Sequence, residues 1–138
     1  MANEHVIEPH IEVEQISHRR GVKAGTWLLQ WEIKNLGQQP LTIFAVRLPH
    51  GQFRSPEQEF VLPYKLSANE SVALEIEVAC SEAPGTAVEN AFLILRVLWL
   101  DNPWRIFARL RVTFDSDGAP HAGTELITTQ QTGFSERL

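Results

Sequence analysis

Hydrophobic and polar residues alternate with a period of two along most of the chain, the spacing of a β-strand with one buried face. The segment SVALEIEVAC, residues 71–80, is the clearest case. Its apolar positions begin at Val72 and end at Cys80, while Glu75 and Glu77 fall on the opposite face. This pattern predicts a strand with an apolar side in a core and an acidic side in solvent.

Other segments follow the same rule. TWLLQWEIKN at 26–35 and LTIFAVRLP at 41–49 both read as strands, and the turn-forming sequence Asn35-Leu36-Gly37 lies between them. The remaining candidate strands are 10–20, 91–99, 104–115 and 125–129.

The segment 50–67 carries Gly51, Pro56 and Pro63. Proline cannot donate a hydrogen bond to a neighbouring strand. We therefore expect a long connection there, with at most one short edge strand at 59–62.

The segment WEIKNLGQQPLTIFAVRLP, followed by KLSANESVALEIEV, resembles bacterial immunoglobulin-like and fibronectin type III-like modules. Those modules combine a strand, an Asn-x-Gly turn, a second strand and a Leu-x-Pro-Gly-Glu bend before an alternating strand. This chain has Ala68-Asn69 in place of Pro-Gly, keeps Glu70 and lacks the cysteine pair of antibody domains. The resemblance implies an all-β fold, namely an immunoglobulin-like antiparallel β-sandwich of about seven strands, and a binding or scaffolding role.

The composition supports one folded domain, since 43% of the 138 residues are hydrophobic and 21% are charged. We expect residues 1–130 to form a single β-sandwich domain and residues 131–138 to form a flexible C-terminal tail.

Charge and cysteine content narrow the setting. The formal net charge of -5 argues against a nucleic-acid partner, and Cys80, the single cysteine, suits a reducing compartment. The N-terminal MANEHVIEPHIEVE has neither the basic start nor the apolar run of a signal peptide, and the apolar run 91–95 is far too short to span a membrane. We expect a cytoplasmic protein without a membrane segment.

The two strands at 91–99 and 104–115 read as a hairpin with unequal faces. On the core side, we expect Trp99 to pair with Trp104 around a turn at Asp101-Asn102. The outer side mixes apolar and cationic residues, which is typical of a covered interface rather than of a solvated face. It provides the candidate interaction residues, which are Phe92, Ile94, Arg96, Leu98, Arg105, Phe107, Arg109 and Arg111.

Three occupants would explain such a face. The first is a terminal segment of the same chain, either the C-terminal segment or the acidic N-terminal strand. The second is another copy of the chain in a symmetric homodimer, and the third is a different, acidic protein. We therefore expect a non-catalytic protein-interaction or assembly module.

Two alternatives stay open. One is a small enzyme or ligand-binding protein with a site built from loops. The other is a single-stranded nucleic-acid platform, in which bases stack on the aromatic rings and arginines contact phosphates. The net negative charge makes nucleic acid the weaker alternative.

No catalytic, cofactor or metal signature accompanies these patterns. His5, His10 and His18 match no standard metal-ligand spacing and read as surface histidines. The segment 115–118, DSDG, has part of the acidic content of a calcium loop but reads as a turn. We expect no cofactor, no metal and no catalytic residue.

Overall fold

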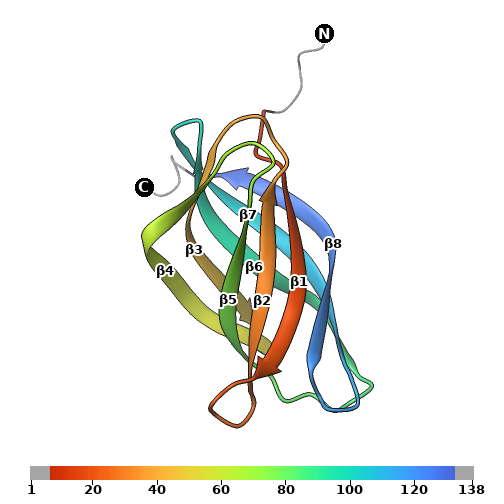
Figure 1. Cartoon of the computed structure of the whole chain (residues 1–138). Coiled ribbons are helices and arrows are strands. Elements are labelled where there is room, and N and C mark those ends of the chain that lie inside the picture. The colour runs from red at the N-terminus through yellow and green to blue at the C-terminus, as the bar shows by residue number, and fades with distance from the viewer. Residues whose placement is uncertain (1–6, 133–138) are drawn as a thin grey trace.

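A computed structural model of the chain describes residues 7–132, which form eight antiparallel strands and no helix (Figure 1). The all-β prediction is therefore confirmed. The strands are β1 (Ile11–Arg20), β2 (Thr26–Asn35), β3 (Leu41–His50), β4 (Phe53–Leu66), β5 (Ser71–Ala79), β6 (Ala87–Trp99), β7 (Asn102–Phe114) and β8 (Pro120–Gln131).

The eight strands form one sheet in the order β1-β2-β5-β4-β3-β6-β7-β8, which curls until its two edge strands approach each other (Figure 1). The expected two-sheet sandwich of about seven strands is wrong in this respect, because the structure is a nearly closed barrel of eight strands. The junction between β4 and β5 is weak, however, since a single ladder pair, Arg54 with Ala79, joins them. A three-stranded part, β1-β2-β5, thus faces a five-stranded part, β4-β3-β6-β7-β8, across the core.

The core is built from the inward faces that the alternation predicts. Trp31, Leu29 and Ile33 on β2 are fully buried, as are Leu93 and Leu95 on β6. Apolar side chains from all eight strands belong to one cluster. The barrel interior is therefore packed with side chains.

The segment predicted to be a long connection is instead β4, a strand of fourteen residues. Its pairing with β3 jumps from Ala45–Glu59 to Ile43–Tyr64, so residues 60–63 bulge out of the ladder. Prolines are tolerated at bulges and along edges, where the missing N–H is not needed. Because β4 hardly pairs with β5, the prolines at 56 and 63 do not prevent the strand.

The hairpin of β6 and β7 has the predicted faces but a different register. Trp99 pairs with Asn102 and Val97 pairs with Trp104, two residues away from the expected Trp99–Trp104 pair. The turn is Leu100-Asp101, not Asp101-Asn102, and both residues have positive φ, 49° and 61°. Two-residue hairpin turns of this kind match the natural twist of paired strands. A shift of two residues leaves every side chain on its original face.

The C-terminal strand is longer than the predicted 125–129. β8 runs from Pro120 to Gln131, and Thr132 after it is buried. The predicted tail at 131–138 therefore begins inside ordered sheet, and its residues 133–138 lie outside the described part of the chain.

Candidate functional site

The structure brings the eight predicted interaction residues together on the outward side of β6 and β7. Ile94 pairs with Phe107, Arg96 with Arg105, and Phe92 with Arg109. Directly paired residues of neighbouring strands point to the same side of a sheet, so these rows form one surface. We call the eight side chains the outer patch: Phe92, Ile94, Arg96, Leu98, Arg105, Phe107, Arg109 and Arg111.

The apolar members of the outer patch are covered to different degrees. Ile94 is only 6% exposed, so it is already buried by its own neighbours in the single chain. Phe92, Leu98 and Phe107 are half-buried. Long arginine side chains can shield apolar surface with their methylene stems, which explains part of this cover. The three half-buried side chains keep apolar surface that another molecule could bury.

Three of the four arginines of the outer patch are paired with carboxylates of the same chain. Arg96 contacts Glu57 at 2.7 Å and Glu59 at 3.2 Å, both on β4. Hydrogen bonding to Glu57, followed by that to Glu59, raises the pKa of Arg96 against the opposing effect of burial.

Two further pairs complete this arrangement. Arg111 contacts Glu89 at 2.7 Å, and Arg109 lies 3.6 Å from Glu125. The outer patch is therefore an apolar surface with nearly balanced charge, rather than a cationic one.

Two apolar residues that sequence reasoning missed extend the outer patch. Leu126 on β8 pairs with Arg109 and is 47% exposed. Phe44 on β3 lines a small surface hollow together with Arg96, Pro103 and Arg105. Alternation in β3 and β8 places Phe44 and Leu126 on the outward faces of these strands. It does not show that β3 and β8 flank the hairpin, which only the strand order reveals.

Both ordered terminal strands lie within the sheet. β1 pairs with β2, and β8 pairs with β7, so β8 widens the surface of the outer patch and β1 lies at the far end of the strand order. The same-chain explanation requires a terminal strand to fold over the outer patch. Neither β1 nor β8 does so. The possible cover by residues 133–138 lies outside the described residues.

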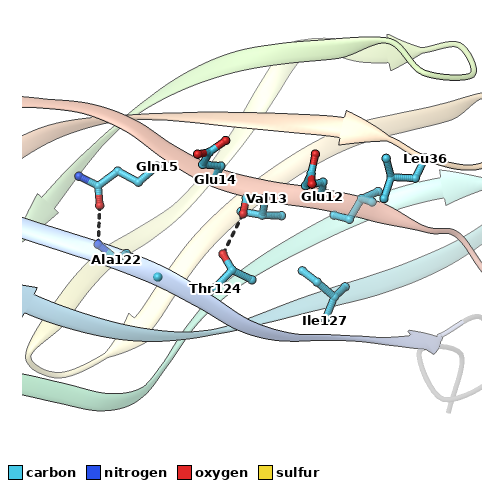
Figure 2. A pocket seen from close by; sticks show the side chains of 10 residues that line it. Glu12, Val13, Glu14, Gln15, Leu36, Ala122, Thr124 and Ile127 are labelled. Carbon is cyan, nitrogen blue, oxygen red and sulfur yellow. Dashed lines mark hydrogen bonds between the residues drawn. The ribbon is translucent and has the colours of Figure 1, made fainter.

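A groove runs along the seam where β1 and β8 approach each other (Figure 2). Its volume is about 580 Å³. Within residues 7–132, no ladder pair joins these two strands, and side chains bridge them instead. Gln15 bonds to backbone groups of β8, and the Thr124 hydroxyl donates to the Val13 carbonyl oxygen at 2.8 Å.

The seam groove combines apolar and acidic side chains. Val13, Leu36 and Ile127 line it, while Glu12 and Glu14 are exposed along β1 (Figure 2). The carboxylates of Glu12 and Glu14 in Figure 2 point away from β8. The groove therefore offers shape and apolar contact, with no convergent set of acid, base and nucleophile that would indicate catalysis.

The other residues examined for chemistry are dispersed. Cys80 is buried, and burial followed by the charge of Glu82 raises its thiol pKa to about 11. Glu75 is exposed on the outward face of β5 and pairs with Arg19 at 2.9 Å. These surroundings favour packing and surface roles over nucleophilic or acid–base roles.

The sequence predicts three surface histidines, His5, His10 and His18, and the two within the described residues do not gather with each other. His5 lies outside the described residues, His10 precedes β1, and His18 lies near the far end of that strand. His18 instead meets Asp115 and His121, a pairing that the spacing along the sequence did not indicate.

No protein-family model and no curated protein matches the chain. Among solved structures, the chain is similar to the X-ray structure of Northeast Structural Genomics Consortium target SoR45. The two are 12% identical over 88% of this chain and 83% of that chain, with a TM-score of 0.29. Residues 7–132 include no helix that is long and apolar enough to cross a membrane. Function is therefore inferred from the residues of this chain alone.

Proposed function

We propose that the protein is a non-catalytic assembly module that forms a symmetric homodimer through the outer patch. The observation that carries the proposal is the combination of half-buried apolar side chains and internally neutralised arginines on one sheet face. Phe92, Leu98 and Phe107 supply apolar surface, and Leu126 adds to it. Outward sheet faces are usually polar, and contiguous apolar surface is a common sign of an interface.

Charge balance favours a second copy over an acidic partner. Glu57 and Glu89 accept hydrogen bonds from the guanidinium groups of Arg96 and Arg111, and Glu125 lies 3.6 Å from Nε of Arg109. The negative charges of these carboxylates would repel an acidic protein or a nucleic acid, and such a partner would have to displace them to reach the arginines. A second copy brings the same balanced surface and meets it through a two-fold axis, so each apolar row contacts its counterpart.

The size of the face also fits a dimer. Strands β3, β6, β7 and β8 lie side by side, and β6 and β7 are each 13 residues long. At about 4.8 Å between strands and about 3.3 Å per residue, the face measures about 19 Å by 43 Å, or about 800 Å². Standard protein interfaces bury about 800 Å² on each partner.

The immunoglobulin-like assignment and the cytoplasmic location remain part of this proposal. The single ladder pair between β4 and β5 supports the first, because it divides the eight-stranded barrel into a three-stranded part and a five-stranded part. The free, buried Cys80 is compatible with the second.

Introducing charge at the outer patch tests the homodimer. Phe107→Glu and Leu126→Glu each place a carboxylate in the proposed contact, and sedimentation equilibrium should then give a monomer mass with an unchanged far-ultraviolet spectrum. Ile94→Glu is unsuitable, since Ile94 is buried in the single chain and its replacement would disturb folding.

Leu28→Glu is the matched control. Leu28 is half-buried on the outward side of β2, in the three-stranded part of the barrel. This variant should keep the dimer mass. A dimer that survives both Phe107→Glu and Leu126→Glu would exclude the outer patch as the interface.

A further inference from the structure

Two histidines and one aspartate meet at the end of the seam between β1 and β8. His18 comes from β1, Asp115 follows β7 and His121 comes from β8. One potential ligand atom from each lies within 4.8 Å of the others. The arrowhead of β1 and the start of β8 both lie at the lower end of the barrel (Figure 1).

The carboxylate of Asp115 is held in place by the turn that it organises. Its Oδ1 accepts hydrogen bonds from the N–H groups of Asp117 at 2.8 Å and Ala119 at 3.0 Å. Its Oδ2 lies 2.8 Å from Nε2 of His121. One oxygen thus fixes the carboxylate, and the other is directed at the imidazole.

His18 completes the group from the other side of the seam. Its ring lies 4.9 Å from that of His121, edge to face, and 5.9 Å from the ring of Trp27. Arg20 stacks on the Trp27 ring at 4.6 Å and donates a hydrogen bond to the Asp117 carbonyl oxygen at 3.3 Å. These contacts keep the arginine on the ring and the backbone rather than on the Asp115 carboxylate.

We propose that His18, Asp115 and His121 bind a divalent transition-metal ion of the Zn²⁺ class. Two imidazoles and one carboxylate are ligands typical of such ions, which leave a fourth position for water or another donor. Tetrahedral Zn²⁺ places its ligand atoms about 3.3 Å apart, so the present spread must contract by about 1.5 Å at most. Both histidine side chains are exposed and can rotate to supply this contraction, while the Asp115 carboxylate stays in place.

The metal takes the Nε2 lone pair of His121, and the imidazole proton then resides on Nδ1. The hydrogen bond between His121 and Asp115 is replaced by two bonds to the ion. The backbone hydrogen bonds to Asp115 Oδ1 remain and orient the carboxylate, the role of outer groups in metal sites.

Metal binding would close the barrel at a weak point. His18 lies on one edge strand, and the other two ligands lie on or beside the opposite edge strand, between which no ladder pair is formed in residues 7–132. An ion that links the two edges binds the folded chain better than the unfolded chain, so it raises the free energy of unfolding.

Titration of the metal-free full-length chain with ZnCl2 tests the site. At about pH 7.5, calorimetry should show one ion bound per chain. His18→Ala and His121→Ala should each weaken binding by about tenfold or more, since loss of even an outer partner has effects of that size. Zn²⁺ should also raise the thermal midpoint of the natural chain more than that of the His18→Ala and His121→Ala variants.

His10→Ala and His50→Ala are the controls, because these histidines lie outside the cluster. They should bind Zn²⁺ as the natural chain does. His18 and His121 are both exposed, and circular dichroism verifies that the His18→Ala and His121→Ala variants fold. The proposal is overturned if the natural chain binds no Zn²⁺ at about 1 mM, a weak affinity. It is equally overturned if His18→Ala and His121→Ala both retain full affinity for Zn²⁺.

Discussion

The side chain of Gln15 on β1 accepts a hydrogen bond at 2.8 Å from the backbone N–H of Ala122 on β8. The same side chain donates to the carbonyl oxygen of Pro120 at 3.0 Å. A carboxamide thus stands where the peptide groups of a neighbouring strand would otherwise lie. The seam of the barrel is closed by this side chain, because β1 and β8 share no ladder pair within the described residues.

Gln15→Ala should destabilise the protein by about 1–3 kcal/mol, the cost of leaving a partly buried donor and acceptor without partners. Urea unfolding followed by fluorescence measures this change. Ser17→Ala is the control, since the Ser17 hydroxyl makes one exposed hydrogen bond to Gln30 at 3.3 Å. Equal stability of the two variants would show that the seam does not depend on Gln15.

Asn35 is the second polar side chain on which the fold depends, and it is 1% exposed. Its Nδ2 lies within hydrogen-bond distance of the carbonyl oxygens of Gln39, Leu66 and Ser67, and its Oδ1 accepts from the N–H of Gly37. It therefore ties the turn after β2 to the end of β4.

Asn35→Ala removes these partners from buried backbone groups and should lower the free energy of unfolding by about 2–4 kcal/mol. Chemical denaturation measures the loss. Asn102→Ala, at the exposed first position of β7 where Nδ2 donates to the Leu100 carbonyl oxygen, should cost less than about 1 kcal/mol. A small loss at Asn35 would mean that water replaces its hydrogen bonds.

The alternation of hydrophobic and polar residues predicts the buried faces of the strands but not the roles of polar residues such as Gln15 and Asn35. Alternation correctly identified the inward faces of β2, β5 and the hairpin, because a buried face requires apolar residues at every second position. It missed most of β4, because its prolines lie in a strand that is nearly unpaired on one side. It could not show barrel closure either, because the seam depends on a Gln and a Thr that look like ordinary surface residues.

Cys80 should resist thiol reagents in the folded protein. Burial and the charge of Glu82 raise its pKa from 9.0 to about 11, which lowers the thiolate fraction near neutral pH by about 100-fold, apart from the effect of restricted access. Reaction with a chromogenic disulfide should be slow without denaturant and fast in urea. Rapid labelling of the native chain would contradict the buried position of Cys80.

Asp115 should make the fold sensitive to acid. Hydrogen bonding from His121, aided by the N–H groups of Ala119 and Asp117, lowers its pKa from 3.8 to about 2. Between these values the unfolded chain binds a proton that the folded chain does not, so stability is lost as the pH falls from about 4 to about 2.

Asp115→Asn removes this titration. Its urea midpoint should fall less than that of the natural chain when the pH is lowered from about 5 to about 2.5. Identical losses in the two proteins would show that other carboxylates account for the acid sensitivity.

The sequence likewise predicts which residues form the outer patch but not which residues they contact. Its eight residues could be identified from two strands, because the arginines had to face outward. Their pairing with Glu57, Glu89 and Glu125 could not, since those partners come from β4, the start of β6 and β8. The pairing favours a second copy over a different, acidic protein, two of the three occupants that the sequence leaves open. The cluster of His18, Asp115 and His121 likewise depends on edge strands that meet only after the sheet curls.

The most direct test of the central claim is the solution mass of the natural protein by sedimentation equilibrium over a range of concentrations. The homodimer predicts twice the chain mass of 15.6 kDa, with dissociation on dilution at a concentration set by the interface. A mass of one chain at every concentration would contradict it.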